Sequence, residues 1–224
     1  IRDNGMFDSH RATLYKIDKQ TGDRLQNGII VGESDGDSFG HGVAAFDAGT
    51  GERSLLISAP LHSVSAASRH DGAVYRFDGF GGGFTGRFDS LNASLRINGV
   101  ESGGRFGDSM AVCADLDGDG IEEWLVAATR SNAGAEMGGS VTLILSTELA
   151  DIDPQIGAGA FGSRWYSQFT GARAGRALSC SHDFTGDGVA DLVIGAPYAD
   201  STDGLDAAGA VYVLSGAEPP ASGL

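Results

Sequence analysis

The sequence has few cysteines, half as many bases as acids and no long apolar run, and each shortage excludes a class of protein. Two cysteines among 224 residues are too few for a disulfide-rich scaffold. Fifteen Lys and Arg against 30 Asp and Glu leave a formal charge of −15. This charge argues against nucleic acid as the main partner, because the phosphate backbone repels such a surface. No segment reaches the roughly 18 uncharged apolar residues of a membrane span, so we expect no membrane insertion.

Helical periodicity is also missing. No segment keeps apolar residues at i, i+3, i+4 and i+7 over three turns. Instead, short runs rich in Val, Leu, Ile and Tyr are bounded by Gly, Asp, Asn and Ser, which is typical of strands. Glycine fills 36 positions without the every-third-residue period of collagen. We therefore predict a turn-rich, all-β fold.

The chain repeats itself. Phe39-Gly40, Phe106-Gly107 and Ala174-Gly175 stand at equivalent positions, 67 and 68 residues apart. Each is followed by three apolar runs, of which the third covers residues 72–77, 139–144 and 209–214. Weaker runs at 25–31, 93–97 and 163–169 are expected to be fourth, outermost strands. Four short strands per repeat of this size match a β-propeller blade with long loops.

The Phe-Gly openings and the Gly-Ala-Pro ending at 195–197 resemble FG-GAP repeats, the blades of the integrin α-subunit head. The resemblance spans residues 12–215, although the second repeat ends in Ala-Ala-Thr and the third opens with Ala-Gly. It implies a seven-bladed ring. Closed propellers typically need four to eight blades, so about three blades cannot close alone. We expect the rest of the propeller, or another chain, to complete the ring.

The repeat predicts the domain organisation. Residues 1–224 are expected to form a partial FG-GAP β-propeller of four-stranded antiparallel blades. Residues 1–37 would end a preceding blade, 38–104 and 105–173 would each form a blade, and 174–224 would form an incomplete blade.

Two acidic loops carry the strongest chemical signal. Their acidic or polar positions are spaced 1, 3, 5, 7 and 9, as in a calcium-binding loop, with glycine at the sixth position for a sharp turn. Calcium prefers oxygen ligands, and without a cation so many acids would repel one another. We expect two structural calcium sites. The predicted ligands are Asp115, Asp117, Asp119, Ile121 (carbonyl) and Glu123 in the second repeat, and Asp183, Thr185, Asp187, Val189 (carbonyl) and Asp191 in the third.

The equivalent loop of the first repeat, residues 47–54, is one residue shorter and has only two acids. We predict that it holds no metal, and Arg53 could replace the charge of the cation. Acidic Asp-Gly turns also occur without metal, which is the alternative interpretation of the two richer loops.

The remaining motifs indicate less. Cys113 and Cys180 are offset by one residue relative to the first acid of each loop, which would direct them to opposite faces of their strands, so two buried free thiols are expected. Asn92-Ala93-Ser94 is a glycosylation sequon, relevant if the protein is secreted by a eukaryote. One Gly-x-Ser-x-Gly and two Gly-x-Gly-x-x-Gly matches lack the helix that their chemistry requires.

The loops opposite the metal loops form the candidate binding face, because alternate connections of an up-and-down blade fall at opposite ends. In the integrin head, by resemblance, ligand and partner subunit engage this face. Tyr198 with Asp200 is the preferred pair, since an exposed aromatic beside a carboxylate suits a carbohydrate or a peptide. The charged and aromatic residues predicted on this face are Asp35, Asp37, His62, Arg69, His70, Glu101, Arg105, Arg130, Glu136, Tyr198, Asp200, Asp203 and Asp206. Of these, His62 and Arg130 complete the predicted ligand site.

The resemblance and the metal loops favour an extracellular or cell-surface, calcium-stabilised interaction module that binds protein or glycan in an adhesion-like role, without enzymatic activity. Two alternatives stay open at this point. FG-GAP-like propellers also accompany polysaccharide-acting or lipid-acting enzymes, and exposed blade edges would suit a structural assembly subunit.

Overall fold

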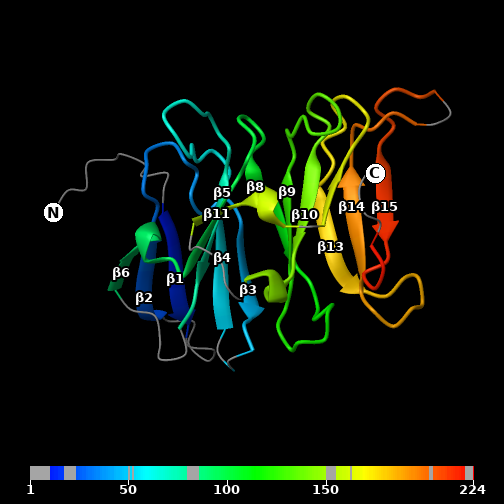
Figure 1. Cartoon of the computed structure of the whole chain (residues 1–224). Helices are drawn as coiled ribbons and strands as arrows, with labels where there is room; N and C mark the ends of the chain where they lie inside the picture. Colours follow the sequence, from blue (N-terminus) through cyan, green and yellow to red (C-terminus); the bar gives the residue numbers. More distant parts are fainter. Residues whose placement is uncertain are drawn as a thin grey trace.

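Four β-sheets lie side by side in chain order in the computed structural model of the chain (Figure 1). No helix of the described residues has the length and apolar character needed to cross a bilayer. The structure describes residues 11–17, 24–49, 51, 53–79, 86–149, 155–161, 163–201, 204–219 and 224.

The N-terminal sheet has three strands in the described residues. Strand β1 (Arg11–Ile17) pairs with β2 (Arg24–Val31) in an antiparallel hairpin. A third strand, β6 (Gly86–Asp89), joins β2 in parallel although it comes from the connection between two strands of the next sheet.

Blades 1 and 2 each contain four antiparallel strands in the order predicted, with the fourth strand beside the third. A short extra strand, β11 (Gln155–Gly157), comes from the chain of blade 2 and pairs in parallel with β7 of blade 1. Blade 1 consists of β3 (Val43–Asp47), β4 (Arg53–Ala59), β5 (Ala73–Phe77) and β7 (Leu95–Asn98), with the 3₁₀ helix η2 (Ser90–Asn92) before β7. Blade 2 consists of β8 (Phe106–Val112), β9 (Trp124–Ala128), β10 (Ser140–Ile144) and β12 (Arg164–Tyr166), with η3 (Ser146–Leu149) and η4 (Ala158–Ala160) between its last two strands.

Blade 3 has three strands in the described residues. These are β13 (Ala177–His182), β14 (Asp191–Ala196) and β15 (Ala210–Leu214), paired antiparallel in that order. The blade boundaries at residues 38, 105 and 174 stay a prediction. The strands of each antiparallel blade fall within the predicted ranges, whereas β6 and β11 reach back to the preceding sheet.

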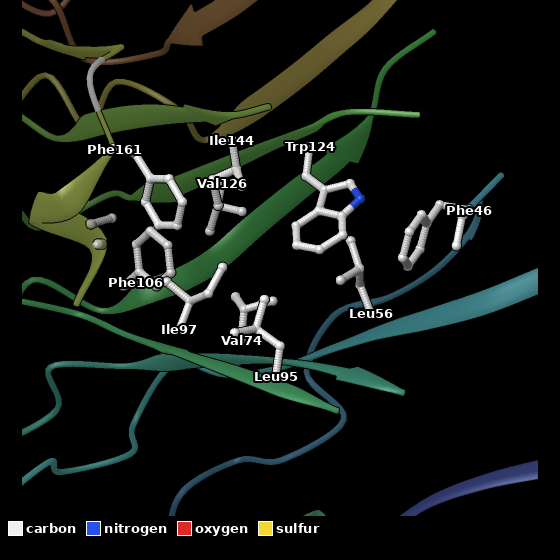
Figure 2. Packing of buried hydrophobic residues seen from close by; sticks show 13 residues of the cluster. Phe46, Leu56, Val74, Leu95, Ile97, Phe106, Trp124, Val126, Ile144 and Phe161 are labelled. Carbon is white, nitrogen blue, oxygen red and sulfur yellow. The ribbon is translucent and has the colours of Figure 1, made fainter. Parts of the chain in front are cut away.

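Apolar cores fill the spaces between neighbouring sheets. Successive side chains of a strand point to opposite faces, so a strand between two blades needs apolar residues at every position. In β9, Trp124 and Val126 pack toward blade 1, while Leu125 and Ala127 pack toward blade 3, and all are buried. Figure 2 shows Trp124 beside Phe46 and Leu56 of blade 1. Full burial of a side chain such as Leu125 or Val126 contributes about 1.5–3 kcal/mol of burial free energy, so the blades stabilise one another.

The Phe-Gly motif at residues 106–107 packs blade 2 against blade 1. Phe106 forms a parallel bridge with Gly72 of blade 1. Gly107 has a φ of +89°, and a Cβ atom there would lie 2.8 Å from Ser58 Cβ. Only glycine fits this close, left-handed turn, which explains the residue type of the repeat motif.

Candidate functional site

The acidic loop of blade 2 gathers four carboxylates around one point. Asp115, Asp117, Asp119 and Glu123 each offer one oxygen, and these oxygens lie within 4.8 Å of one another. Oxygens on opposite sides of one calcium ion are about 4.6–5.2 Å apart, given bonds of about 2.3–2.6 Å. The cluster therefore has the size of a calcium site.

The backbone of this loop curls around Asp115. Its Oδ1 accepts from the amides of Gly118 and Asp119, and its Oδ2 accepts from the amide of Gly120 at 2.8 Å. Gly120 has a φ of +87°, in agreement with the sharp turn predicted at the sixth position. These bonds fix the first carboxylate at the centre of the turn and direct the other acids toward it.

Glu123 is the last acid of the loop and directly precedes β9. Its environment is unfavourable for an unpaired charge. It is 0% exposed. Its Oε2 accepts from the Leu116 amide at 2.6 Å, whereas its Oε1 has no hydrogen-bond partner in the described residues. The pKa of this carboxyl is raised to about 7, mainly because the group is buried; the Leu116 amide opposes the rise, and the neighbouring carboxylates of the loop add to it. A buried, unpartnered carboxylate oxygen among acids is what a bound cation would satisfy.

The acidic loop of blade 3 repeats this arrangement with one charge fewer. Asp183, Asp187 and Asp191 bring their oxygens within 4.8 Å, and Asp183 accepts from the amides of Gly186 and Gly188. Asp191 is fully buried at the position of Glu123, but here both oxygens have donors. Burial acts to raise the pKa of Asp191, and the amides of Phe184 and Thr185 with the Thr185 hydroxyl outweigh it, so the pKa is lowered.

The predicted backbone ligands at the seventh positions are the carbonyls of Ile121 in the blade 2 loop and Val189 in the blade 3 loop. The amides of Ile121 and Val189 donate to Asp119 and Asp187 at 2.8 and 2.9 Å. Thr185 uses its hydroxyl to donate to Asp191 at 3.0 Å. The carbonyls of Ile121 and Val189 and the hydroxyl of Thr185 stay predicted calcium ligands.

The short loop of blade 1 is attached to the acidic loop of blade 2 through Glu122, a residue that the sequence left without a role. Glu122 Oε2 accepts from the Asp47 amide at 2.6 Å and from Arg53 Nη1 at 3.2 Å. The amide of Glu122 donates back to the Asp47 carbonyl. Arg53 therefore pairs with an acid of the next blade rather than with Asp47 of its own loop.

The expectation of two free thiols is wrong. Cys113 and Cys180 form a disulfide that joins blades 2 and 3 directly before their acidic loops. The strand register explains the error. Strand β13 has an irregularity between Ser179 and His182, where two of its residues oppose a single residue of β14. Such a bulge shifts the alternation of side chains, so counting residues back from Asp183 gives the wrong face.

The loops of the candidate binding face lie at the end of the sheets away from the acidic loops. In Figure 1 the loops after β4 and β14 lie at the top, and the orange loop before β14 lies at the bottom. The structure does not gather the four predicted ligand residues into one site. Tyr198 and Asp200 lie in the loop after β14, Arg130 lies in the loop after β9, and His62 lies in the loop after β4.

His62 is buried, with 5% of its surface exposed. Its Nδ1 lies 2.7 Å from Asp37 Oδ2, and its Nε2 lies 3.8 Å from Glu33 Oε1. These contacts tie the loop after β4 to the segment before β3. His62 therefore has a structural role in blade 1, and we leave it out of the proposed ligand surface.

Tyr198 is half exposed, and the guanidinium of Arg173 lies 5.5 Å from its ring centroid. Asp200 is exposed and accepts from the Ala207 amide at 2.9 Å. Arg130 is half-buried, and its amide donates to the Gly104 carbonyl at the junction of blades 1 and 2. Tyr198, Asp200 and Arg173 together present an aromatic ring and both signs of charge. Sequence reasoning missed Arg173, because nothing in its spacing links it to Tyr198.

Glu33, Tyr75 and Arg96 form a polar cluster in blade 1 that the sequence did not predict. Glu33 Oε1 accepts from the Tyr75 hydroxyl and from Arg96 Nη1, both at 2.7 Å. Burial raises the pKa of Tyr75, and the Glu33 carboxylate raises it further. Glu101 lies 3.8 Å from Arg164 at the equivalent position of blade 2. In blades 1 and 2, the repeat thus reproduces an acid–arginine pair between the segment before the blade and its fourth strand.

The comparison with protein families agrees with this geometry. The FG-GAP repeat family matches residues 174–214, which contain the strands β13 to β15 and the second acidic loop. Fold and family match together define the chain as an FG-GAP β-propeller region.

Its relatives are integrin α subunits. The chain is 34% identical over 172 residues to human integrin alpha-IIb, 32% over 177 residues to integrin alpha-5 of Xenopus laevis, and 27% over 216 residues to integrin alpha-PS3 of Drosophila melanogaster. These alignments cover 75%, 76% and 88% of this chain, and 15%, 16% and 18% of the relatives. The chain is an integrin α-like FG-GAP region that spans less than a fifth of the length of these relatives.

Proposed function

We propose that this chain is part of a calcium-stabilised β-propeller that acts as an adhesion-type interaction module outside the cell. The observation that carries the proposal is the acidic loop of blade 2. There Glu123 is fully buried, and one of its oxygens has no partner among the described residues; it lies among three aspartates with calcium-loop spacing. Millimolar calcium outside cells suits loops of this kind.

Both acidic loops would hold calcium as a structural ion. Blade 2 would bind through Asp115, Asp117, Asp119, Glu123 and the Ile121 carbonyl, and blade 3 through its equivalent residues, which carry one acid fewer. The test is thermal unfolding in calcium and in excess chelator. We expect the midpoint to rise with calcium, because an ion that binds only the folded state stabilises it. An unchanged midpoint would contradict the proposal.

The disulfide supports an extracellular or cell-surface location. Disulfides form and persist in oxidising compartments and are rare in the cytosol. Cys113 and Cys180 are both 2% exposed, so the bond is part of the folded core. The sequon residue Asn92 is exposed at the end of η2, where an attached glycan would extend into solvent. We include N-glycosylation of Asn92 in the proposal, and loss of mass on enzymatic deglycosylation of secreted protein tests it.

The ring would be completed by further blades, and the open face of blade 3 supports this part of the proposal. Val211 is 69% exposed, whereas its equivalents in blades 1 and 2, Val74 and Val141, are buried by the Phe-Gly or Ala-Gly turn of the next blade. A pocket of about 460 Å³ lies at the corresponding place on blade 3. Its lining includes Arg176, Ala177, Ala196, Pro197, Gly209 and Val211. Another FG-GAP blade is the partner that fits this face.

The candidate binding face would recognise a protein or glycan ligand through Tyr198, Asp200 and Arg130. Tyr198→Ala should weaken capture of a ligand on a glycan or protein array, while the calcium-induced rise in melting temperature stays unchanged. His62→Ala serves as the contrast, because loss of a buried histidine should lower stability. Equal ligand binding by wild type and Tyr198→Ala would place recognition elsewhere.

A further inference from the structure

The acidic loops are held at their tips by hydroxyl groups from another part of the same blade. Ser146 Oγ donates to Asp119 Oδ2, and Thr147 Oγ1 donates to Asp117 Oδ2 at 3.0 Å. In blade 3, Ser215 Oγ donates to Asp187 Oδ2 at 2.6 Å. These donors come directly after the third strand of their blade, β10 or β15. Nothing in the spacing of the acids themselves requires such partners.

We propose that Ser146 and Thr147 are positioning residues of the blade 2 calcium site, an inference that rests on the proposed function. The second oxygen of each aspartate also has a donor. Asp119 Oδ1 accepts from the Ile121 amide at 2.8 Å, and Asp117 Oδ1 accepts from the Asp119 amide at 3.3 Å. With both oxygens bonded, each carboxylate plane is fixed. Each oxygen has a further lone pair for a cation.

The segment that carries the hydroxyls is itself anchored. Glu148 accepts from the Leu145 amide through Oε2, and its own amide donates to the Leu145 carbonyl, both at 3.1 Å. Leu149 packs against the apolar core between blades 1 and 2. The hydroxyls therefore approach the loop from a fixed direction, which is the property that an outer-shell partner of a metal ligand needs.

Blade 2 has a second feature, besides its clustered acids, that points to a bound cation. Glu123 Oε1 is buried beside the two aspartates that accept from the hydroxyls, and no group in the described part of the chain donates to it. In blade 3 the equivalent Asp191 has donors on both oxygens. The positioning role therefore belongs to blade 2, and Ser215 of blade 3 serves as the matched control.

The experiment is a calcium titration by isothermal calorimetry in the Asp183→Asn background, which leaves the blade 2 loop intact. Ser146→Ala combined with Thr147→Val should raise the calcium Kd by about tenfold or more, as loss of outer-shell partners does in metal sites. Thr147→Ser keeps the hydroxyl and should bind like the parent. Ser215→Ala removes the same kind of bond from blade 3 and should leave the remaining Kd unchanged.

Melting curves separate positioning from general stability. The double variant should lose part of the calcium-induced rise in melting temperature while its midpoint in excess chelator changes little. If the double variant has an unchanged calcium Kd, or if its melting midpoint falls equally with and without calcium, the positioning role of Ser146 and Thr147 is wrong. Calcium binding by the parent protein would still support the proposed function. A parent that binds no calcium would overturn the proposed function itself, and the inference with it.

Discussion

Glu123 combines complete burial, an unpartnered oxygen and three acidic neighbours in a single side chain. Glu123→Gln keeps its shape and removes its charge, so we expect the calcium Kd of blade 2 to rise by at least about tenfold. Calorimetry in the Asp183→Asn background measures this change. Glu122→Gln is the control, because the adjacent Glu122 contacts Arg53 and Asp47 of blade 1 instead. Equal losses for both variants would contradict a direct role of Glu123.

The same residue should make the calcium-free protein pH-sensitive. The folded state raises the pKa of Glu123 from its usual 4.5 to about 7, so folding favours the protonated form. Its contribution to the free energy of unfolding is therefore complete below about pH 4.5 and is lost as pH rises through about 7. Chemical denaturation of wild type and Glu123→Gln between pH 4 and 8, in calcium-free buffer, isolates this contribution. A difference between the two proteins that does not vary with pH would refute it.

Calcium binding at blade 2 should depend on pH in the opposite direction and become stronger as the pH rises. Because a carboxylate must be deprotonated to bind metal, calcium binding displaces the Glu123 proton. We expect the affinity of blade 2 to increase from pH 5.5 to pH 8, with proton release detected in buffers of different ionisation enthalpy. Affinity that falls over this range would contradict the assignment of Glu123 as a ligand.

Residues whose role depends on local spacing could be predicted from the sequence, and those that act through distant contacts could not. The acids of each loop lie within nine residues, so their clustering follows from the turn at Gly120 or Gly188. His62 was predicted on the candidate binding face because it lies in a loop, but it is buried and its Nδ1 contacts Asp37, which is distant in the sequence. The contact of Glu122 with Arg53 also joins separate repeats.

At the scale of elements, the disulfide links β13 covalently to the residue that follows β8. Its two cysteines are 67 residues apart. Closing a loop of this length restricts the unfolded chain, and we expect the Cys113→Ser, Cys180→Ser double variant to lose about 2–4 kcal/mol of unfolding free energy. Urea denaturation of the oxidised wild type and the variant measures this loss. Equal midpoints would mean that the bond contributes nothing to stability.

The antiparallel strands were predictable as elements, because apolar runs between turn residues specify them locally. The parallel strands β6 and β11 were not. Both are short segments from the connection between the third and fourth strands of one blade, and they pair with the outer strand of the preceding sheet. Their register depends on how two neighbouring blades pack together. The short sequence of β6 or β11 does not specify that packing.

At the scale of the whole molecule, the outer face of blade 3 differs from the equivalent buried faces. Val141→Arg would place an unpaired charge in the core between blades 2 and 3 and should cost at least about 3 kcal/mol. Val211→Arg, at the equivalent exposed position, should leave the stability of this chain nearly unchanged. Thermal unfolding of the two variants makes the comparison. In a longer chain that includes a following blade, Val211→Arg should become destabilising, and equal tolerance there would argue against ring completion on this face.

Strand β15 ends its sheet in the described part of the chain, beside a surface on which Val211 and Val213 are exposed. Such an edge presents a row of free amides and carbonyls to which another copy can add a strand. If two copies pair through the same β15 edge, the contact closes as a dimer, whereas a strand added from a different edge joins unlike surfaces and can continue from copy to copy into fibres. Purified on its own, the chain should precipitate as its concentration rises, and a charged residue at position 213 should delay precipitation.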